Sequence, residues 1–152
     1  NVLSGVRLSR HYLPRMLDQN WGRIIFISSE SGIQIPAEMV HYGTTKTAQL
    51  GVSRGLAQQT AGTNVTVNTV IPGSTRSEGS EKFINDLAQE RGLSKEDVER
   101  EFFEKIRPTS LLERFATIDE VATFVTYLAS PLAAANNGAA LRVDGGTVST
   151  IL

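Results

Sequence analysis

The chain contains no cysteine and has only two histidines among its 152 residues. The missing thiols exclude disulfide bridges, thiolate metal sites and a cysteine nucleophile. His11 and His41 are too few and too scattered to form a metal cluster. We therefore expect no metal site and no thiol chemistry.

The chain also has little net charge and no long apolar run. Lys and Arg number 15 against 16 Asp and Glu, which gives a formal net charge of −1. This balance provides no basic surface for a nucleic acid and no polybasic patch for a membrane. No apolar run reaches the length of a membrane span, and the first residues lack the charged-then-apolar pattern of a signal peptide. These absences favour a cytoplasmic protein.

The composition that remains is typical of one soluble globular domain. Hydrophobic residues make up 40% of the chain and charged residues 20%, and a chain of this length can bury a core. A strand, a helix and a second strand follow one another early in the sequence, and this order makes the two strands parallel. The pattern predicts an α/β fold. Strands are expected at 23–27, 65–71 and 138–143, and helices at 2–17, 41–61, twice within 78–107, and from 118 to about 130.

Local signals predict where several helices begin or break. Ser94 and Thr117 are expected to be N-caps, and Glu120, three residues after Thr117, completes the pattern of a capping box. Pro14 should bend the first helix or end it near its last turn.

The most informative stretch is 28–46, where Tyr42 stands four residues before Lys46. Residues at i and i+4 of a helix share a face, so an ammonium would lie beside a phenol. A phenol has an ordinary pKa of about 10, and a positive charge roughly 4 Å away at an effective dielectric of about 20 contributes on the order of 4 kcal/mol, or about three pKa units. Such a phenol could exchange protons near neutral pH. The pair predicts proton transfer to or from an oxygen atom.

The surroundings of this pair resemble the catalytic core of the short-chain dehydrogenase/reductase family. An apolar strand ends in serines, and Ser29 precedes Tyr42 by thirteen residues. The resemblance implies that Ser29 holds the substrate oxygen, that Tyr42 exchanges its proton, and that Lys46 assists Tyr42 and holds the cofactor ribose. Residues 1–5 also fit the family's N-x-x-x-G motif, which implies that Asn1 is a fourth catalytic residue that supports the proton relay.

The same resemblance implies a nicotinamide cofactor, NAD or NADP. In the family, the residues after a Pro-Gly at the end of a strand contact the nicotinamide carboxamide, and here Pro72-Gly73 ends the second predicted strand. Thr75 and Ser77 are the expected contacts, Ser77 standing where the family usually has Thr. Together with Tyr42 and Lys46, these residues form the predicted cofactor site.

The resemblance covers only the second half of the family's three-layer, Rossmann-like, doubly wound parallel sheet. No Gly-rich turn opens a helix after a first strand, and such a turn is what binds the pyrophosphate. We therefore interpret residues 1–152 as a single partial domain without the dinucleotide-binding half, and expect this chain alone to bind NAD(P) poorly or not at all. The family also implies a homodimer or homotetramer.

The segment 78–107 matches the family's variable lid, which implies that it covers a small carbonyl or alcohol substrate. Phe102 and Phe103 are expected to pack within this segment, although a lid bearing them would also suit an apolar substrate.

The sequence thus predicts an NAD(P)-dependent oxidoreductase that interconverts a carbonyl and an alcohol by hydride transfer. Two alternatives remain at this point: a catalytically silent, oligomerising fragment of the same fold, and a non-redox lyase on that fold. Lys46 argues against the lyase, because dehalogenase-like lyases of this fold carry Arg at that position.

Overall fold

The structure is a computed structural model that describes residues 1–151, and its helices and strands alternate along most of the chain. Two short 3-10 turns, η1 and η2, lie in the loop between β1 and α2, a third, η4, follows α5, and a π-helical turn (η3) extends α4. The elements are α1 (Val2–Asp18), β1 (Gly22–Ile27), η1 (Glu30–Gly32), η2 (Ala37–Met39), α2 (Val40–Gln58), β2 (Val65–Pro72), α3 (Glu78–Arg91), α4 (Lys95–Glu101), η3 (Phe102–Ile106), α5 (Ile118–Ala129), η4 (Pro131–Ala133) and β3 (Ala140–Val143).

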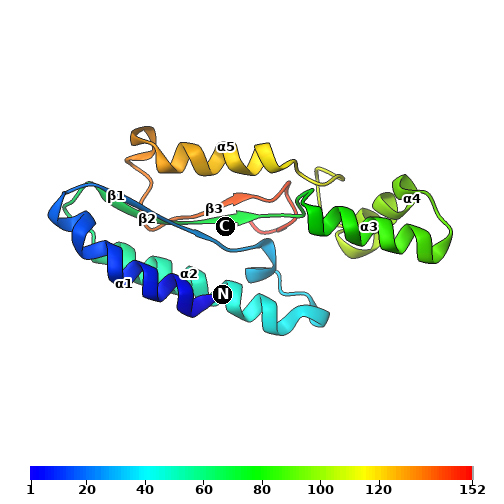
Figure 1. The fold of residues 1–152 in the computed structure, drawn as a ribbon, viewed down its shortest axis with the longest axis horizontal. Coiled ribbons are helices and arrows are strands. Elements are labelled where there is room, and N and C mark those ends of the chain that lie inside the picture. The colour runs from blue at the N-terminus through cyan, green and yellow to red at the C-terminus, as the bar shows by residue number, and fades with distance from the viewer. Residues whose placement is uncertain (152) are drawn as a thin grey trace.

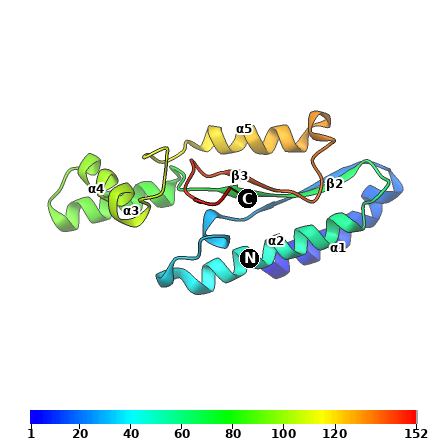
Figure 2. The same cartoon turned by 180° about the vertical axis from the view of Figure 1, so that it is seen from behind.

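The three strands form one parallel sheet in the order β1-β2-β3. The central strand β2 is buried over nearly its whole length, because neighbours cover it on both faces and both edges. Helices α1 and α2 lie on one face of the sheet and α5 lies on the other (Figures 1 and 2). This arrangement confirms the predicted α/β class with a parallel sheet in three layers.

Each face of the sheet carries its own apolar core. On the side of α2, Phe26 and Val67 from the sheet pack with Ala57. On the side of α5, Val70 packs with Leu128. Val67 and Val70 are an odd number of positions apart on β2 and therefore contribute to opposite cores, as the alternation of side chains along a strand requires.

The predicted helix signals are confirmed at the N-termini and revised within two helices. The Ser94 hydroxyl accepts from the backbone N–H of Asp97, and Thr117 forms the reciprocal capping box with Glu120. Pro14 lies inside α1, which continues to Asp18, so the proline does not end the helix. Leu13, the residue before the proline, is buried. Helix α2 ends at Gln58, earlier than the expected 61, because the chain turns there before β2.

The segment that contains α3, α4 and η3 extends beyond the end of the sheet (Figures 1 and 2). It has a separate apolar core, in which Ile84 and Val98 are buried with Phe103 and Phe115. The rings of Phe102 and Phe103 each lie within about 5 Å of Phe115. The prediction that this aromatic pair packs inside the segment is therefore confirmed.

Candidate active site

Ser29 stands just past the end of β1, at the carboxyl edge of the sheet. The backbone N–H of Ser28 still donates to the carbonyl of Val70 at 2.8 Å, so the chain leaves β1 beside β2. Ser29 itself is extended and buried, and its hydroxyl accepts from the N–H of Ser31 at 3.1 Å as the cap of η1. Because β1 and β2 are parallel, Pro72 and Gly73 leave the sheet at the same edge. This edge is where open α/β sheets bind ligands.

Helix α2 presents Tyr42 and Lys46 on one side, as their spacing predicts. The Lys46 ammonium lies 5.6 Å from the centre of the Tyr42 ring and donates to the carbonyl of Ile27, the last residue of β1, at 2.8 Å. Burial lowers the pKa of Lys46 from its ordinary value of 10.5. An ammonium has three N–H donors, and in residues 1–151 only the one to Ile27 has a partner. Lys46 thus joins the end of β1 to the face of α2 that carries Tyr42.

The loop after Ser29 lies directly against α2, and Gly32 makes this possible. A Cβ at Gly32 would stand 2.9 Å from the carbonyl carbon of Lys46 and 3.0 Å from the Ser28 hydroxyl. That hydroxyl donates to the Lys46 carbonyl at 2.9 Å, and Thr47 donates to the carbonyl of Gly32 at 2.7 Å. Gly32 ends the 3-10 turn η1, and its lack of a side chain allows this turn to approach the helix closely.

Asn1 lies beside the same helix. Its side-chain amide donates to the Thr45 hydroxyl at 3.0 Å, and its carbonyl accepts from the side chain of Gln49 at 2.9 Å. Thr45 in turn donates to the carbonyl of Tyr42. Asn1 is therefore adjacent to the turns of α2 that carry Tyr42 and Lys46.

The predicted cofactor residues after β2 form a tight loop. A Cβ at Gly73 would meet the carbonyl of Asp144 at 2.5 Å, so the end of β2 lies against the turn after β3. The Thr75 hydroxyl donates to the Gly73 carbonyl at 3.0 Å, and Thr75 forms an isolated parallel bridge with Ala116. Ser77 is the N-cap of α3, in a reciprocal capping box. The hydroxyl of Ser77 accepts from the backbone N–H of Ser80 at 3.3 Å.

Comparison with known proteins identifies the group to which this arrangement belongs. Residues 1–148 match the family described as "Enoyl-(Acyl carrier protein) reductase". This chain belongs to the short-chain dehydrogenase/reductase family. An uncharacterized oxidoreductase of Bacillus subtilis, YvaG, is 51% identical over 151 residues, which are 99% of this chain and 57% of that protein. A D-beta-hydroxybutyrate dehydrogenase of Rhizobium meliloti is 34% identical, over 96% of this chain and 55% of the relative.

Solved structures agree with the fold. L-sorbose reductase from Gluconobacter frateurii, in complex with NADPH and L-sorbose, superposes with a TM-score of 0.90 at 29% identity, over 99% of this chain and 56% of the reductase. The chain therefore spans a little over half the length of these relatives, and its sheet corresponds to part of the Rossmann-like sheet of short-chain dehydrogenase/reductases.

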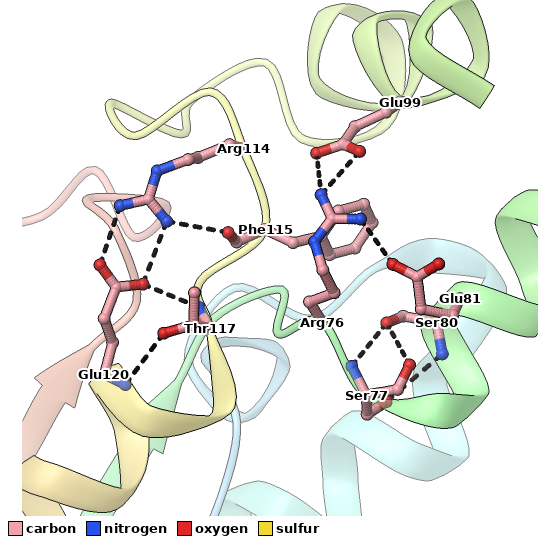
Figure 3. Close-up of polar contacts among 9 residues, drawn as sticks. All are labelled: Arg76, Ser77, Ser80, Glu81, Glu99, Arg114, Phe115, Thr117 and Glu120. Atoms are coloured by element: carbon pink, nitrogen blue, oxygen red, sulfur yellow. Dashed lines mark hydrogen bonds and ion pairs between the residues drawn. The ribbon is translucent and has the colours of Figure 1, made fainter. Parts of the chain in front are cut away.

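Arg76 is a residue of this short-chain dehydrogenase/reductase that the sequence interpretation missed. Its guanidinium donates to Glu81 of α3 at 2.6 Å and to both carboxylate oxygens of Glu99 of α4 at 2.6 and 2.7 Å, while it lies over the ring of Phe115 (Figure 3). The hydrogen bonds to the Glu99 carboxylate are the main reason that the pKa of Arg76 is raised above its ordinary value. Arg76 thus fixes α3 and α4 to the loop that carries Thr75. Its only sequence signal was its position between two predicted cofactor residues.

A second missed group adjoins Ser29. Glu30 is buried, with an exposed fraction of 6%, and accepts from the Ser29 hydroxyl at 2.5 Å. Its other oxygen accepts from Ser31 at 3.1 Å and from the Arg107 guanidinium at 3.0 Å. Arg107 stands at the end of η3, 77 residues along the chain. No local pattern in the sequence indicates this pairing.

Other kinds of site find no support in the part of the chain that the structure describes. Residues 1–151 contain no group of three or more His, Cys, Asp or Glu side chains placed to hold a metal ion. Within the same residues, none of the helices combines the length and the apolar character needed to cross a bilayer.

Proposed function

We propose that this chain is the catalytic half of an NAD(P)-dependent oxidoreductase that interconverts a carbonyl and an alcohol in the cytoplasm. The observation that carries the proposal is the placement of Lys46. Its ammonium donates to the carbonyl of Ile27, two residues before Ser29, and lies 5.6 Å from the centre of the Tyr42 ring. This placement supports a site in which the Ser29 hydroxyl, the Tyr42 phenol and the Lys46 cation act together at the sheet edge where ligands bind in this class of fold.

Each residue has a distinct part in the proposed reaction. Tyr42 gives its phenolic proton to the substrate oxygen in reduction and takes it back in oxidation. The positive charge of Lys46 stabilises the tyrosinate that is left. Ser29 holds the substrate oxygen, and its hydrogen must turn away from Glu30 to do so. Asn1, next to the turns of α2 with Tyr42 and Lys46, supports the return of a proton to the site.

The residues present fit a nicotinamide cofactor. Lys46 has N–H donors without partners in residues 1–151, as the hydroxyls of a ribose require, and Pro72, Gly73 and Thr75 border the same edge. When bound, NAD(P) supplies or accepts the hydride, which is chemistry that no side chain can perform. Ser77 is proposed as a further contact.

Substitution of Tyr42 by Phe tests the function. The assay uses the full chain that the gene encodes and follows NADH or NADPH absorbance. The first substrates are D-3-hydroxybutyrate, its keto form acetoacetate, and L-sorbose, because one relative is a D-beta-hydroxybutyrate dehydrogenase and one similar structure is an L-sorbose reductase. Tyr42→Phe keeps the ring and removes the acid, so turnover should fall by about 100-fold or more. Tyr127→Phe on α5, on the opposite face of the sheet, is the matched control. Equal turnover in the two variants would refute the role of Tyr42.

We further propose that the protein assembles as a homodimer or homotetramer. Helix α1, which lies beside α2 on the outer layer, leaves the apolar side chains of Leu3, Val6, Leu8 and Tyr12 exposed. Light scattering coupled to size exclusion should give two or four times the mass of one chain. A monomer at micromolar concentration would contradict the assembly.

A further inference from the structure

Glu30 and Arg107 form an unusual ion pair. Their side chains are 8% and 14% exposed, whereas in every other pair found within residues 1–151 at least one side chain is 40% exposed or more. Burying two charged groups carries a desolvation cost in free energy that an exposed ion pair largely avoids. The pair is thus an unusually buried charged group, and it is hydrogen-bonded directly to Ser29.

The hydrogen bonds of Ser29 define what the pair does. A hydroxyl has one hydrogen and two acceptor sites. The hydrogen of Ser29 points to Glu30 at 2.5 Å, a length typical of a bond to a charged oxygen. One acceptor site takes the N–H of Ser31. The oxygen of Ser29 is thus held from two directions, and Glu30 supplies one of them.

An unpaired Glu30 carboxylate would oppose the proposed reaction. Negative charge develops on the substrate oxygen as hydride reaches the carbon, and Ser29 must direct its hydrogen to that oxygen. A free carboxylate one hydrogen bond from Ser29 would compete for the hydrogen and repel the developing charge. Arg107, whose guanidinium donates to Glu30 at 3.0 Å, neutralises it. Arg107 is itself held at the end of η3, where it also donates to the Ile106 carbonyl and lies over the ring of Phe102.

We propose that Glu30 and Arg107 are positioning residues for Ser29: Glu30 holds the Ser29 hydroxyl before the substrate binds, and Arg107 neutralises Glu30 so that Ser29 can then release its hydrogen to the substrate oxygen. Because Arg107 ends the segment that contains α3, α4 and η3, this pair also ties that segment to the loop after Ser29. The inference rests on the proposed function, whose own test is Tyr42→Phe.

The test compares Arg107→Gln, Glu30→Gln and the double variant in the full chain, by turnover at a temperature where circular dichroism shows each to be folded. Arg107→Gln alone should lower kcat by about 100-fold, the size of losing one donor to a developing oxyanion. The double variant should regain about tenfold of that loss, because the unpaired carboxylate is gone. Arg107→Lys should keep more activity than Arg107→Gln. Glu120→Gln, which breaks the exposed pair with Arg114, is the control.

A Ser29→Ala background separates positioning from general damage. If the pair acts through Ser29, Arg107→Gln should change the residual turnover of Ser29→Ala by less than about threefold, since the effects of residues that act as one unit are not additive. An undiminished loss in that background, a double variant as slow as Arg107→Gln, or an Arg107→Gln enzyme as fast as the Glu120→Gln control would each overturn the inference.

Failure of the two proposals gives different results. An active wild type with an inactive Tyr42→Phe and an unaffected Arg107→Gln leaves the function standing and removes the positioning role. If the wild type turns over none of the substrates, amide hydrogen exchange decides. Residues 28–34 should then exchange faster in Glu30→Gln and Arg107→Gln than in Glu120→Gln, and unchanged exchange in that loop would refute the pair as a positioning device.

Discussion

Gly32 gives the sharpest test of how the loop after Ser29 is held against α2, because one added methyl group would meet both the loop and the helix. In Gly32→Ala the new Cβ would lie 2.9 Å from the Lys46 carbonyl carbon, 3.0 Å from the Ser28 hydroxyl and 3.1 Å from the Lys46 Cβ. Ordinary contact begins at 3.4 Å, so the loop and the helix must separate by about half an ångström. Overpacking of this kind costs about 1–3 kcal/mol in free energy of unfolding.

The same displacement moves Ser29 relative to Tyr42 and Lys46. A misplacement of about 1 Å can cost on the order of 100-fold in rate, so about half of that should cost roughly tenfold in kcat. Urea unfolding measures the stability, and NAD(P)H absorbance measures the turnover of the full chain.

Gly51→Ala is the matched control, since it lies on the same helix α2 and a Cβ there meets nothing within 4 Å. It should raise the stability by about 0.5–1 kcal/mol, because alanine loses less entropy in a helix. Its turnover should stay at the wild-type level. The reasoning would be refuted if Gly32→Ala were as stable and as active as Gly51→Ala.

Three further changes test other parts of the molecule. Arg76→Gln removes the paired bonds to Glu99 and should lower stability by about 1 kcal/mol after allowance for exposure, seen as a lower urea midpoint. The hydrogen bond from Arg114 is the main reason that the pKa of Glu120 is lowered from 4.5 to about 2. The ionised carboxylate therefore stabilises the fold fully above pH 4.5, and this contribution is lost as the pH falls toward 2. Glu120→Gln should thus be less stable than the wild type at neutral pH, and denaturant titrations should show the difference shrinking between pH 4.5 and 2. Phe103→Ala should cost about 3–5 kcal/mol within the core shared by α3 and α4, and amide exchange should rise there before it rises in β2.

Much of the fold could be predicted because its signals are local. The apolar run before Ser29 and the run before Pro72 predict buried parallel strands, and both strands occur with nearly the expected bounds. The caps at Ser94 and Thr117 depend on side chains that bond to the backbone three residues away. Prediction was weaker where tertiary packing decides: nothing local indicates that the chain after α4 continues as the π-helical turn η3, which places Phe103 in a core with Phe115.

The candidate site divides in the same way. The sequence predicts that Tyr42 and Lys46 share a helix face because they are one turn apart, and in the structure the lysine ammonium lies 5.6 Å from the centre of the tyrosine ring. Glu30 was visible only as an acidic residue after two serines, a pattern equally compatible with a solvated loop.

Arg107, the partner of Glu30, comes from a segment whose own apolar side chains pack into a separate core. The contact between Arg107 and Glu30 depends on where that core holds the end of η3 relative to the sheet. A buried charge must find an opposite charge, so burial of Glu30 implies a cation nearby. Only the folded chain shows that this cation ends the segment beyond the sheet, so that Ser29 is linked through Glu30 to the position of that segment.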